Sequence, residues 1–132
     1  MLDEIDHVAI AVKSLKTAEA LYCGVLGFKP LRRETVADQG VHVLAVDLNG
    51  LCVELMEPTG PDSPVGRFLE KRGEGLHHLC FKVKDLAAEL ARLSAEGFTL
   101  IDKAPRRGAG GHLIAFVHPK STNGVLMELR QA

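Results

Sequence analysis

Hydrophobic and polar positions alternate in two stretches that share one pattern, Asp6–Val12 and His77–Val83. Because side chains of a β-strand point alternately to its two faces, each stretch predicts a strand with one apolar face. The other face begins with a histidine in each copy, His7 in the first and His78 in the second. The alternation therefore predicts an internal repeat with a histidine at an equivalent place in each half.

A helical spacing of apolar residues follows each strand. Ser14 and Asp85 are the expected N-caps, and Gly27 and Gly97 the expected ends,. The apolar positions of the first helix are Ala18, Leu21, Tyr22 and Val25, and those of the second are Leu86, Leu90 and Leu93,. The copies lie 71 residues apart at the histidines and 70 at the glycines. One residue is therefore missing from the second helix.

Three more strands are predicted in each half, separated by turn residues. They cover 30–36, 41–48 and 51–56 in the first half, and 98–101, 113–118 and 125–130 in the second,. Asn49-Gly50 favours a two-residue type I′ hairpin, because both residues tolerate positive φ,. The same pair recurs at Asn123-Gly124, within the shared pattern N-G-x-x-x-E-L. Chance is a poor explanation for that recurrence.

Each half reads strand, helix, strand, strand, strand, and neither can bury both faces of its sheet alone. We therefore expect an α+β fold in which two paired βαβββ modules share one structure. Residues 1–132 are expected to form a single domain, with the repeat over 5–57 and 76–130 and a connector over 58–75. Within the connector, Ser63 and Pro64 predict the start of a short helix,.

Charge and composition exclude several classes of protein. Sixteen basic and seventeen acidic residues give a net charge of -1, so no overall field favours nucleic acid or a membrane as partner,. No apolar run approaches the ~20 residues of a membrane span, and the N-terminus lacks the signal-peptide pattern, so a cytoplasmic location is expected,. Cys23, Cys52 and Cys80 lack metal-binding or redox spacing and are expected to be reduced and mostly buried,.

Glu54 and Glu128 each interrupt an apolar strand in the matching position of the two halves. Burying such a carboxylate costs several kcal/mol unless it is paired, protonated or bound to a cation. Two salt-bridged or rim-exposed glutamates would satisfy this requirement. Together with His7 and His78, however, they form a set of nitrogen and oxygen ligands suited to Co, Mn, Ni, Fe or Zn, with coordination positions left for substrate oxygens.

Several segments together resemble the vicinal oxygen chelate superfamily (glyoxalase, bleomycin resistance and dioxygenase proteins), and within it the methylmalonyl-CoA epimerase family. The matching segments are Asp6–Val12, Glu54–Pro58, Asp62–Pro64, Gly75–Leu79, His118–Lys120 and Gly124–Leu129. They cover nearly the whole chain. The resemblance implies a curved mixed sheet around a metal-binding cleft, a homodimer and a role in propionate metabolism.

The resemblance also implies a site. Its metal ligands would be His7, His78 and Glu128, with Glu54 at a fourth position where family members carry Glu or Gln. His78 rather than His77 is in register with His7. The ion would be divalent, with Co2+ the first candidate and Mn2+, Ni2+, Zn2+, Fe2+ or Mg2+ as alternatives.

The implied reaction interconverts (R)- and (S)-methylmalonyl-CoA by removal of the α-proton through a metal-stabilised enolate, with Glu128 as a catalytic base. Some family members carry a further glutamate where this chain has Val43, so the second base stays open among Asp38, Gln39 and His42.

Arg106, Arg107 and Lys120 are candidates for binding the phosphates of coenzyme A. The first two lie in a basic, glycine-rich segment, Lys103–His112, whose composition is equally typical of a solvated loop,.

Two other functions remain open. A glyoxalase-type isomerase or a thiol transferase of the same superfamily would use the same four ligands, although the segments around Asp62–Pro64 and His118–Lys120 argue against both. A metal-free module that binds small molecules without catalysis is the other alternative. The intact ligand residues in both halves count against it.

Overall fold

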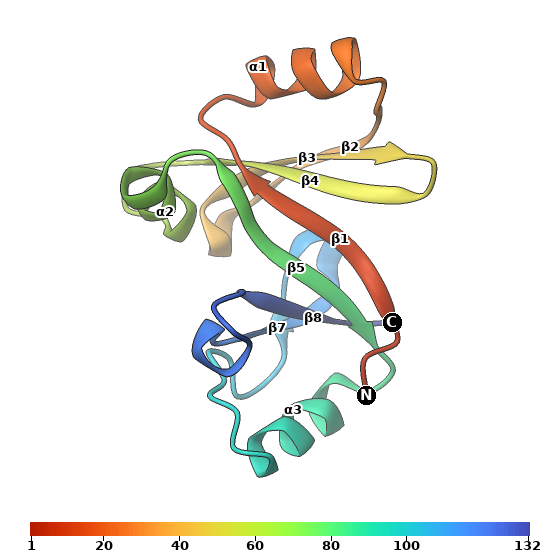
Figure 1. Ribbon diagram of the computed structural model, residues 1–132, viewed down its shortest axis with the longest axis vertical. Coiled ribbons are helices and arrows are strands. Elements are labelled where there is room, and N and C mark those ends of the chain that lie inside the picture. Colours follow the sequence, from red (N-terminus) through yellow and green to blue (C-terminus); the bar gives the residue numbers. More distant parts are fainter. The chain divides into compact units, whose positions relative to one another are not determined.

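The structure, a computed structural model that describes all residues from 1 to 132, has an α+β fold (Figure 1). The chain forms two compact units. The first unit is His7–His77, and the second combines Met1–Asp6 with His78–Ala132. Strand β1, Glu4–Ala11, is therefore divided between the units: its residues up to Asp6 belong to the second unit, and those from His7 onward belong to the first.

The first unit holds a four-stranded sheet with a helix on one face. Its elements after β1 are α1 Leu15–Glu19, the π-helix η1 Ala20–Val25, β2 Lys29–Val36, the 3-10 turn η2 Ala37–Gln39, β3 Val41–Leu48, β4 Leu51–Pro58 and α2 Pro64–Arg72. The strand order is β2-β3-β4-β1, with β1 parallel to β4 and the other pairs antiparallel. The three strands predicted between 30 and 56 are confirmed.

The turn between β3 and β4 has the geometry that its sequence predicts. Asn49 and Gly50 have φ angles of 51° and 94°, and β3 pairs with β4 from Leu48↔Leu51 onward. Positive φ at both central residues is the requirement of a type I′ turn. The turn fixes the register of β4, and with it the face on which Glu54 lies.

The first helix begins as predicted but winds differently. The Ser14 hydroxyl accepts a hydrogen bond from the backbone N–H of Thr17 at 3.2 Å. Beyond Glu19 the helix continues as the π-helix η1, in which the N–H of Leu26 donates to the carbonyl of Leu21. The wider turn rotates the last residues away from the expected stripe, so Leu21 and Val25 are exposed and the prediction that they pack inward is wrong,.

The core of the first unit lies between this helix and the sheet. Its buried members are Val12, Ala18, Leu44, Val46, Val53 and Leu55. Because partners across neighbouring strands share a face, the residues that alternate with them lie on the opposite face of the sheet. That second face carries His7 and Glu54.

The second unit repeats the same design. Its elements are β5 Gly75–Val83, which enters the unit at His78, α3 Leu86–Ala95, β6 Arg106–Arg107, the 3-10 turns η3 Ala109–Gly111 and η4 Pro119–Ser121, β7 Leu113–Val117 and β8 Met127–Gln131. The strand order is β5-β8-β7-β6, with β5 parallel to β8. Both units are thus mixed sheets of the βαβββ kind.

Two predictions for the second half are wrong. Residues 98–101 form no strand, and only an isolated bridge joins Leu100 to Val117. The edge strand is instead the two-residue β6, within the segment expected to be a loop. Asn123 and Gly124 do have positive φ, but they lie in a longer loop that includes η4 rather than in a two-residue hairpin.

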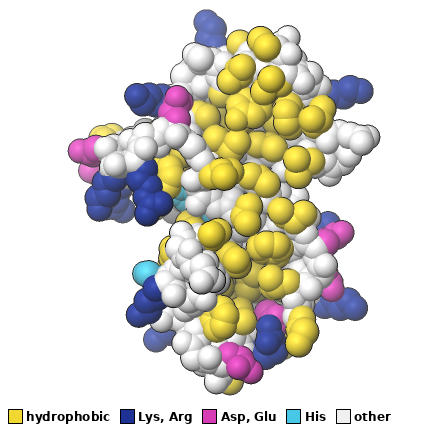
Figure 2. Space-filling view, viewed as in Figure 1, with side chains coloured by type: hydrophobic (Ala, Val, Ile, Leu, Met, Phe, Trp, Pro, Cys, Tyr) yellow, Lys and Arg dark blue, Asp and Glu magenta, His cyan; other side chains and the backbone are white.

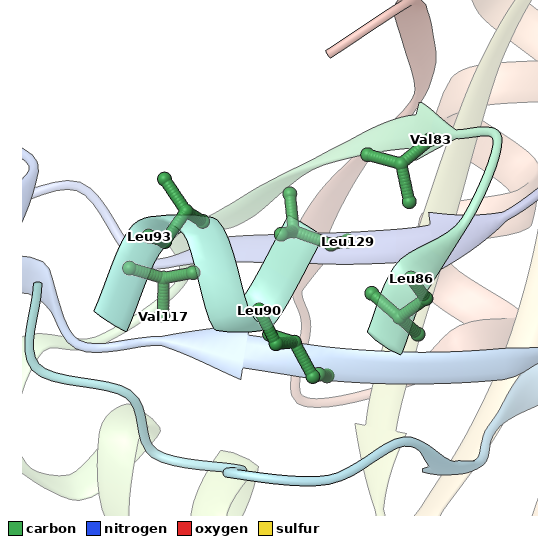
Figure 3. Close-up of a cluster of buried hydrophobic side chains, with 7 residues drawn as sticks. Val83, Leu86, Leu90, Leu93, Val117 and Leu129 are labelled. Atoms are coloured by element: carbon green, nitrogen blue, oxygen red, sulfur yellow. The ribbon is translucent and has the colours of Figure 1, made fainter. Parts of the chain in front are cut away.

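Helix α3 packs on its sheet through the predicted stripe. Asp85 accepts a hydrogen bond from the N–H of Ala88 at 3.1 Å and caps the helix. The buried cluster consists of Val83, Leu86, Leu90, Leu93, Ala115, Val117 and Leu129, and Figure 3 shows the leucines of α3 pointing toward the strand residues. Burying one such leucine contributes about 1.5–3 kcal/mol.

The connector contains the predicted helix α2. The Ser63 hydroxyl accepts a hydrogen bond from the N–H of Gly66 at 3.1 Å, with Pro64 at the first helical position,. Val65 is buried.

No helix of the protein is long and apolar enough to cross a membrane.

Candidate functional site

The first unit holds a buried histidine–carboxylate pair on the face of its sheet away from α1. Ala9 of β1 pairs with Glu54 of β4, and His7 lies two residues before Ala9 on the same face. The Nδ1 atom of His7 is 3.4 Å from Oε2 of Glu54, and the exposed fractions of the two residues are 4% and 5%. The strand pattern of the sequence therefore predicted the right face for both residues.

Arg32 of β2 also contacts this pair, and the sequence analysis did not identify it. Its Nη2 donates a hydrogen bond of 3.0 Å to Oε2 of Glu54, the same oxygen that faces His7. Arg32 pairs with Ala45, which pairs with Glu54, so the three lie in one row across the sheet. An unpaired carboxylate at this depth would be costly, and the guanidinium offsets that cost.

The second unit holds the equivalent pair. His78 of β5 and Glu128 of β8 are buried, and Nε2 of the histidine is 3.0 Å from Oε1 of the glutamate. Cys80, two residues after His78, pairs with Glu128, so all three lie on the face away from α3. The His78 ring also meets the ring of Phe116 edge to face, with centroids 5.4 Å apart. Packing of this kind fixes the orientation of the imidazole.

His77 has a different environment. It belongs to the first unit, and its ring contacts that of Phe68 in α2, with centroids 4.8 Å apart. The alternation of β5 places it on the face opposite to His78,. The adjacent histidines therefore belong to different surroundings, as expected from the register with His7.

The chemistry of the two pairs fits a metal ion. Each unit supplies one imidazole nitrogen and one carboxylate, all from buried residues on rigid strands. Such nitrogen and oxygen donors suit borderline and hard divalent ions. Glu54 already has Arg32 on one oxygen, but a carboxylate offers about four lone-pair positions on two oxygens,.

Of the basic candidates, Arg106 lies over the ring of Phe116, which in turn packs on His78. Its guanidinium carbon is 5.6 Å from the centre of the Phe116 ring, and its Nε donates to Asp102 at 3.0 Å. Arg107, the next residue of β6, pairs with Leu113 and donates to the carbonyl of Gly111 at 2.7 Å. Consecutive strand residues face opposite ways, so the two arginines do not share a surface.

Lys120, the third basic candidate, and His112, the last residue of the segment Lys103–His112, take exposed positions. Lys120 is exposed in η4, and its backbone N–H donates to Nδ1 of His118. The His112 ring nitrogens contact Nη2 of Arg130 at 2.8 and 3.1 Å. None of the three cysteines forms a disulfide, as expected, but only Cys80 is buried, whereas Cys23 and Cys52 are half-buried.

None of the three candidates for the second base, Asp38, Gln39 and His42, is a titratable group on the face of Glu54. His42 lies on the α1 side of the sheet, and its Nδ1 is 2.9 Å from Oγ1 of Thr35. Asp38 is exposed in η2, and Gln39 carries an amide that cannot act as a base. Val43 does lie on the face of Glu54 but has no titratable group.

Two helix-backed βαβββ sheets, each with a buried histidine–glutamate pair on its other face, define a class of protein. The sequence profile described as the Glyoxalase/Bleomycin resistance protein/Dioxygenase superfamily matches residues 6–116. The chain is thus a member of that superfamily.

Comparison with individual relatives identifies the family within this superfamily. The chain is 47% identical to the uncharacterized protein YqjC of Bacillus subtilis, with 97% of this chain and 91% of the relative covered. It is 39% identical to the ethylmalonyl-CoA/methylmalonyl-CoA epimerase of Cereibacter sphaeroides, with 99% of each covered. A solved methylmalonyl-CoA epimerase in complex with methylmalonyl-CoA and NH4+ matches with a TM-score of 0.95 and 36% identity, over 100% of this chain and 96% of that one. The chain belongs to the methylmalonyl-CoA epimerase family.

Proposed function

We propose that the protein interconverts the (R)- and (S)-epimers of methylmalonyl-CoA. Family membership supports this proposal, as does the solved relative that holds methylmalonyl-CoA. The observation that carries it is the pair of buried histidine–glutamate contacts in equivalent positions of the two units. Buried ionisable groups cost stability, and such groups commonly mark a functional site.

The proposal includes one divalent ion held jointly by His7, Glu54, His78 and Glu128, with Co2+ the first candidate. Matching faces of the two repeat units and the mixed donor set support it. Such an ion supplies a fixed positive charge for the enolate that forms when the α-proton leaves. The acidity of that proton, which lies between a thioester and a carboxylate, is otherwise too low for a protein base at neutral pH.

The protein's own residues have two tasks in this reaction. Glu128 is proposed to accept and return a proton on one face of the α-carbon, in addition to its role as a ligand. Arg106, Arg107 and Lys120 are proposed to bind the coenzyme A phosphates, with Arg106 and Arg107 contacting different phosphates from opposite faces of β6. The position of Arg106 beside Phe116 supports its part most directly, because the guanidinium lies next to the ring that packs on His78.

The proposal also includes a homodimer. Figure 2 shows hydrophobic side chains gathered over the upper part of the drawn face, with a further group over its lower part. Exposed apolar residues of the first unit include Leu21, Val25, Leu26 and Leu31. An apolar surface of this kind is typical of an interface. Sedimentation of the purified protein would measure the mass directly.

The test is exchange of the α-proton of methylmalonyl-CoA in deuterated water, with and without a chelator. We expect rapid exchange and epimerisation that the chelator abolishes and Co2+ restores. Activity that survives chelation but requires NH4+, the cation of the solved relative, would retain the epimerase and reject the divalent ion. No exchange under any condition would reject the epimerase itself.

Variants of the histidines test which of them hold the proposed ion. His7→Ala and His78→Ala are expected to lower metal content and activity together, because each removes a coordinating nitrogen. His77→Ala is the matched control and should retain the metal. If His77→Ala loses metal and His78→Ala keeps it, the proposed ligand set is wrong by one strand position.

Glu128→Gln keeps one oxygen ligand and removes the basic carboxylate. Turnover and deuterium exchange should fall by at least about 10²-fold while metal is still detected by elemental analysis. Retained metal with unchanged exchange would limit Glu128 to the role of a ligand.

A further inference from the structure

Inversion at the α-carbon needs proton transfer on both of its faces. A base removes the proton from one face, and an acid returns a proton to the other. Glu128 is proposed for one of these positions, and one carboxylate held on a rigid strand does not reach both faces. A second titratable group is therefore required. In the segment Asp38–His42, His42 faces the α1 side of the sheet, Gln39 has no titratable group, and Asp38 lies in the turn η2 rather than on a strand beside Glu54.

The edge strand β2 carries a carboxylate on the face where the first histidine–glutamate pair lies. Glu34 pairs across the sheet with Val43, and Val43 pairs with Met56. Met56 is two residues after Glu54 in β4, so it shares that residue's face,. Partners across neighbouring strands project from the same face, which places Glu34 on the face of Glu54.

Arg32 connects the two carboxylates. Its Nη2 lies 3.0 Å from Oε2 of Glu54, and its Nε lies 3.7 Å from Oε1 of Glu34. One rigid guanidinium therefore positions both groups, with the buried carboxylate on one side and the edge carboxylate on the other.

The exposure of the two carboxylates suits different roles. The Glu54 side chain is 6% exposed, whereas that of Glu34 is 28% exposed. A ligand benefits from burial, which holds it in place. A proton-transfer group must instead meet the substrate and exchange its proton with water between turnovers. Glu34 meets this requirement, whereas the apolar side chains of its row, Val43 and Met56, have no proton to transfer.

We propose that Glu34 is the second acid–base residue of the epimerase and that Arg32 positions it; this inference rests on the function proposed above. In one direction the Glu34 carboxylate takes the α-proton. The electron pair of the C–H bond forms the C=C bond of the enolate, and the π pair of the thioester carbonyl moves to its oxygen. The protonated Glu128 carboxyl then gives its proton to the opposite face of the α-carbon. Water returns both carboxyls to their starting state. The reverse reaction exchanges the two roles.

The test is Glu34→Gln, measured with each pure epimer in deuterated water. Exposed Glu70 of α2 gives the matched control, Glu70→Gln. Metal content and Tm should equal those of the wild type in both variants. Epimerisation by Glu34→Gln should fall by at least about 10²-fold. One epimer should still incorporate deuterium with retention of configuration, because Glu128 remains, whereas the other should exchange slowly.

Other outcomes separate the two proposals. A wild type without epimerase activity would overturn both. An active wild type with an equally active Glu34→Gln variant would overturn the role of Glu34 alone. Equal loss of exchange for both epimers would also overturn it, because a structural change affects both faces alike. Glu34→Asp, which keeps the carboxylate on a shorter stem, is expected to recover part of the lost epimerisation, and a variant as inactive as Glu34→Gln would contradict the proposal.

Discussion

Arg32→Met tests whether the guanidinium stabilises the buried Glu54 carboxylate. Removing one partner of a fully buried ion pair costs about 3–5 kcal/mol. The Arg32 side chain is 39% exposed, so water already screens part of the interaction, and we expect roughly 2 kcal/mol,. A chain of 132 residues has an unfolding entropy near 0.28 kcal/mol/K, so Tm should fall by about 7 °C,.

A double-mutant cycle isolates the pair. In a Glu54→Gln background no buried carboxylate remains beside Arg32, and Arg32→Met should then cost about 0.5 kcal/mol or less. Urea unfolding of the wild type, the two single variants and the double variant gives the coupling free energy. Arg33→Met is the control on the same strand, because Arg33 pairs with Glu19 in an exposed position, and its Tm should change little. An equal cost of Arg32→Met in both backgrounds would show that its packing, rather than its charge, stabilises the fold.

Replacing both Arg106 and Arg107 by Ala should raise KM for the coenzyme A thioester and leave activity on a short thioester unchanged; equal losses would indicate a structural role. Leu90→Ala should destabilise the protein by about 2–5 kcal/mol in urea unfolding, because the side chain is 2% exposed, and a cost below about 1 kcal/mol would contradict the packing of α3,. A hydrogen bond from Arg92 lowers the pKa of Glu89 from its usual 4.5. The stabilisation of the fold by the ionised Glu89 carboxylate is therefore present above pH 4.5 and lost as pH falls through the lowered pKa. Glu89→Gln should reduce the free energy of unfolding more at pH 7 than at pH 2, and an equal reduction at both pH values would refute this role of the carboxylate.

The sequence predicted those features that depend on local pattern. Strand alternation gave the correct faces for His7, Glu54, His78 and Glu128. The apolar stripe of α3 and the turn at Asn49-Gly50 were also predicted, because helix packing and tight turns follow from a few neighbouring residues,.

The sequence did not predict the features that depend on pairing between strands. Arg32 is 22 residues from Glu54 along the chain, and their contact follows only from the register of three strands. A strand was predicted at 98–101 because those residues are mostly apolar, whereas the edge strand of the second unit is formed by Arg106 and Arg107. Edge strands need few apolar residues, so hydrophobicity is a weak guide to them.

The π-helical turn of the first helix explains how the two helices of unequal length end at equivalent residues. The N–H of Phe28 reaches back to the carbonyl of Tyr22, whereas that of Phe98 reaches back to Leu93, one residue less. The surplus residue is thus accommodated inside η1 as a wider turn,. Its insertion leaves Gly27-Phe28 equivalent to Gly97-Phe98, the two residues that follow the helix in each copy. A gene duplicated in this way can gain or lose a residue at the helix without moving the ligand-bearing strands.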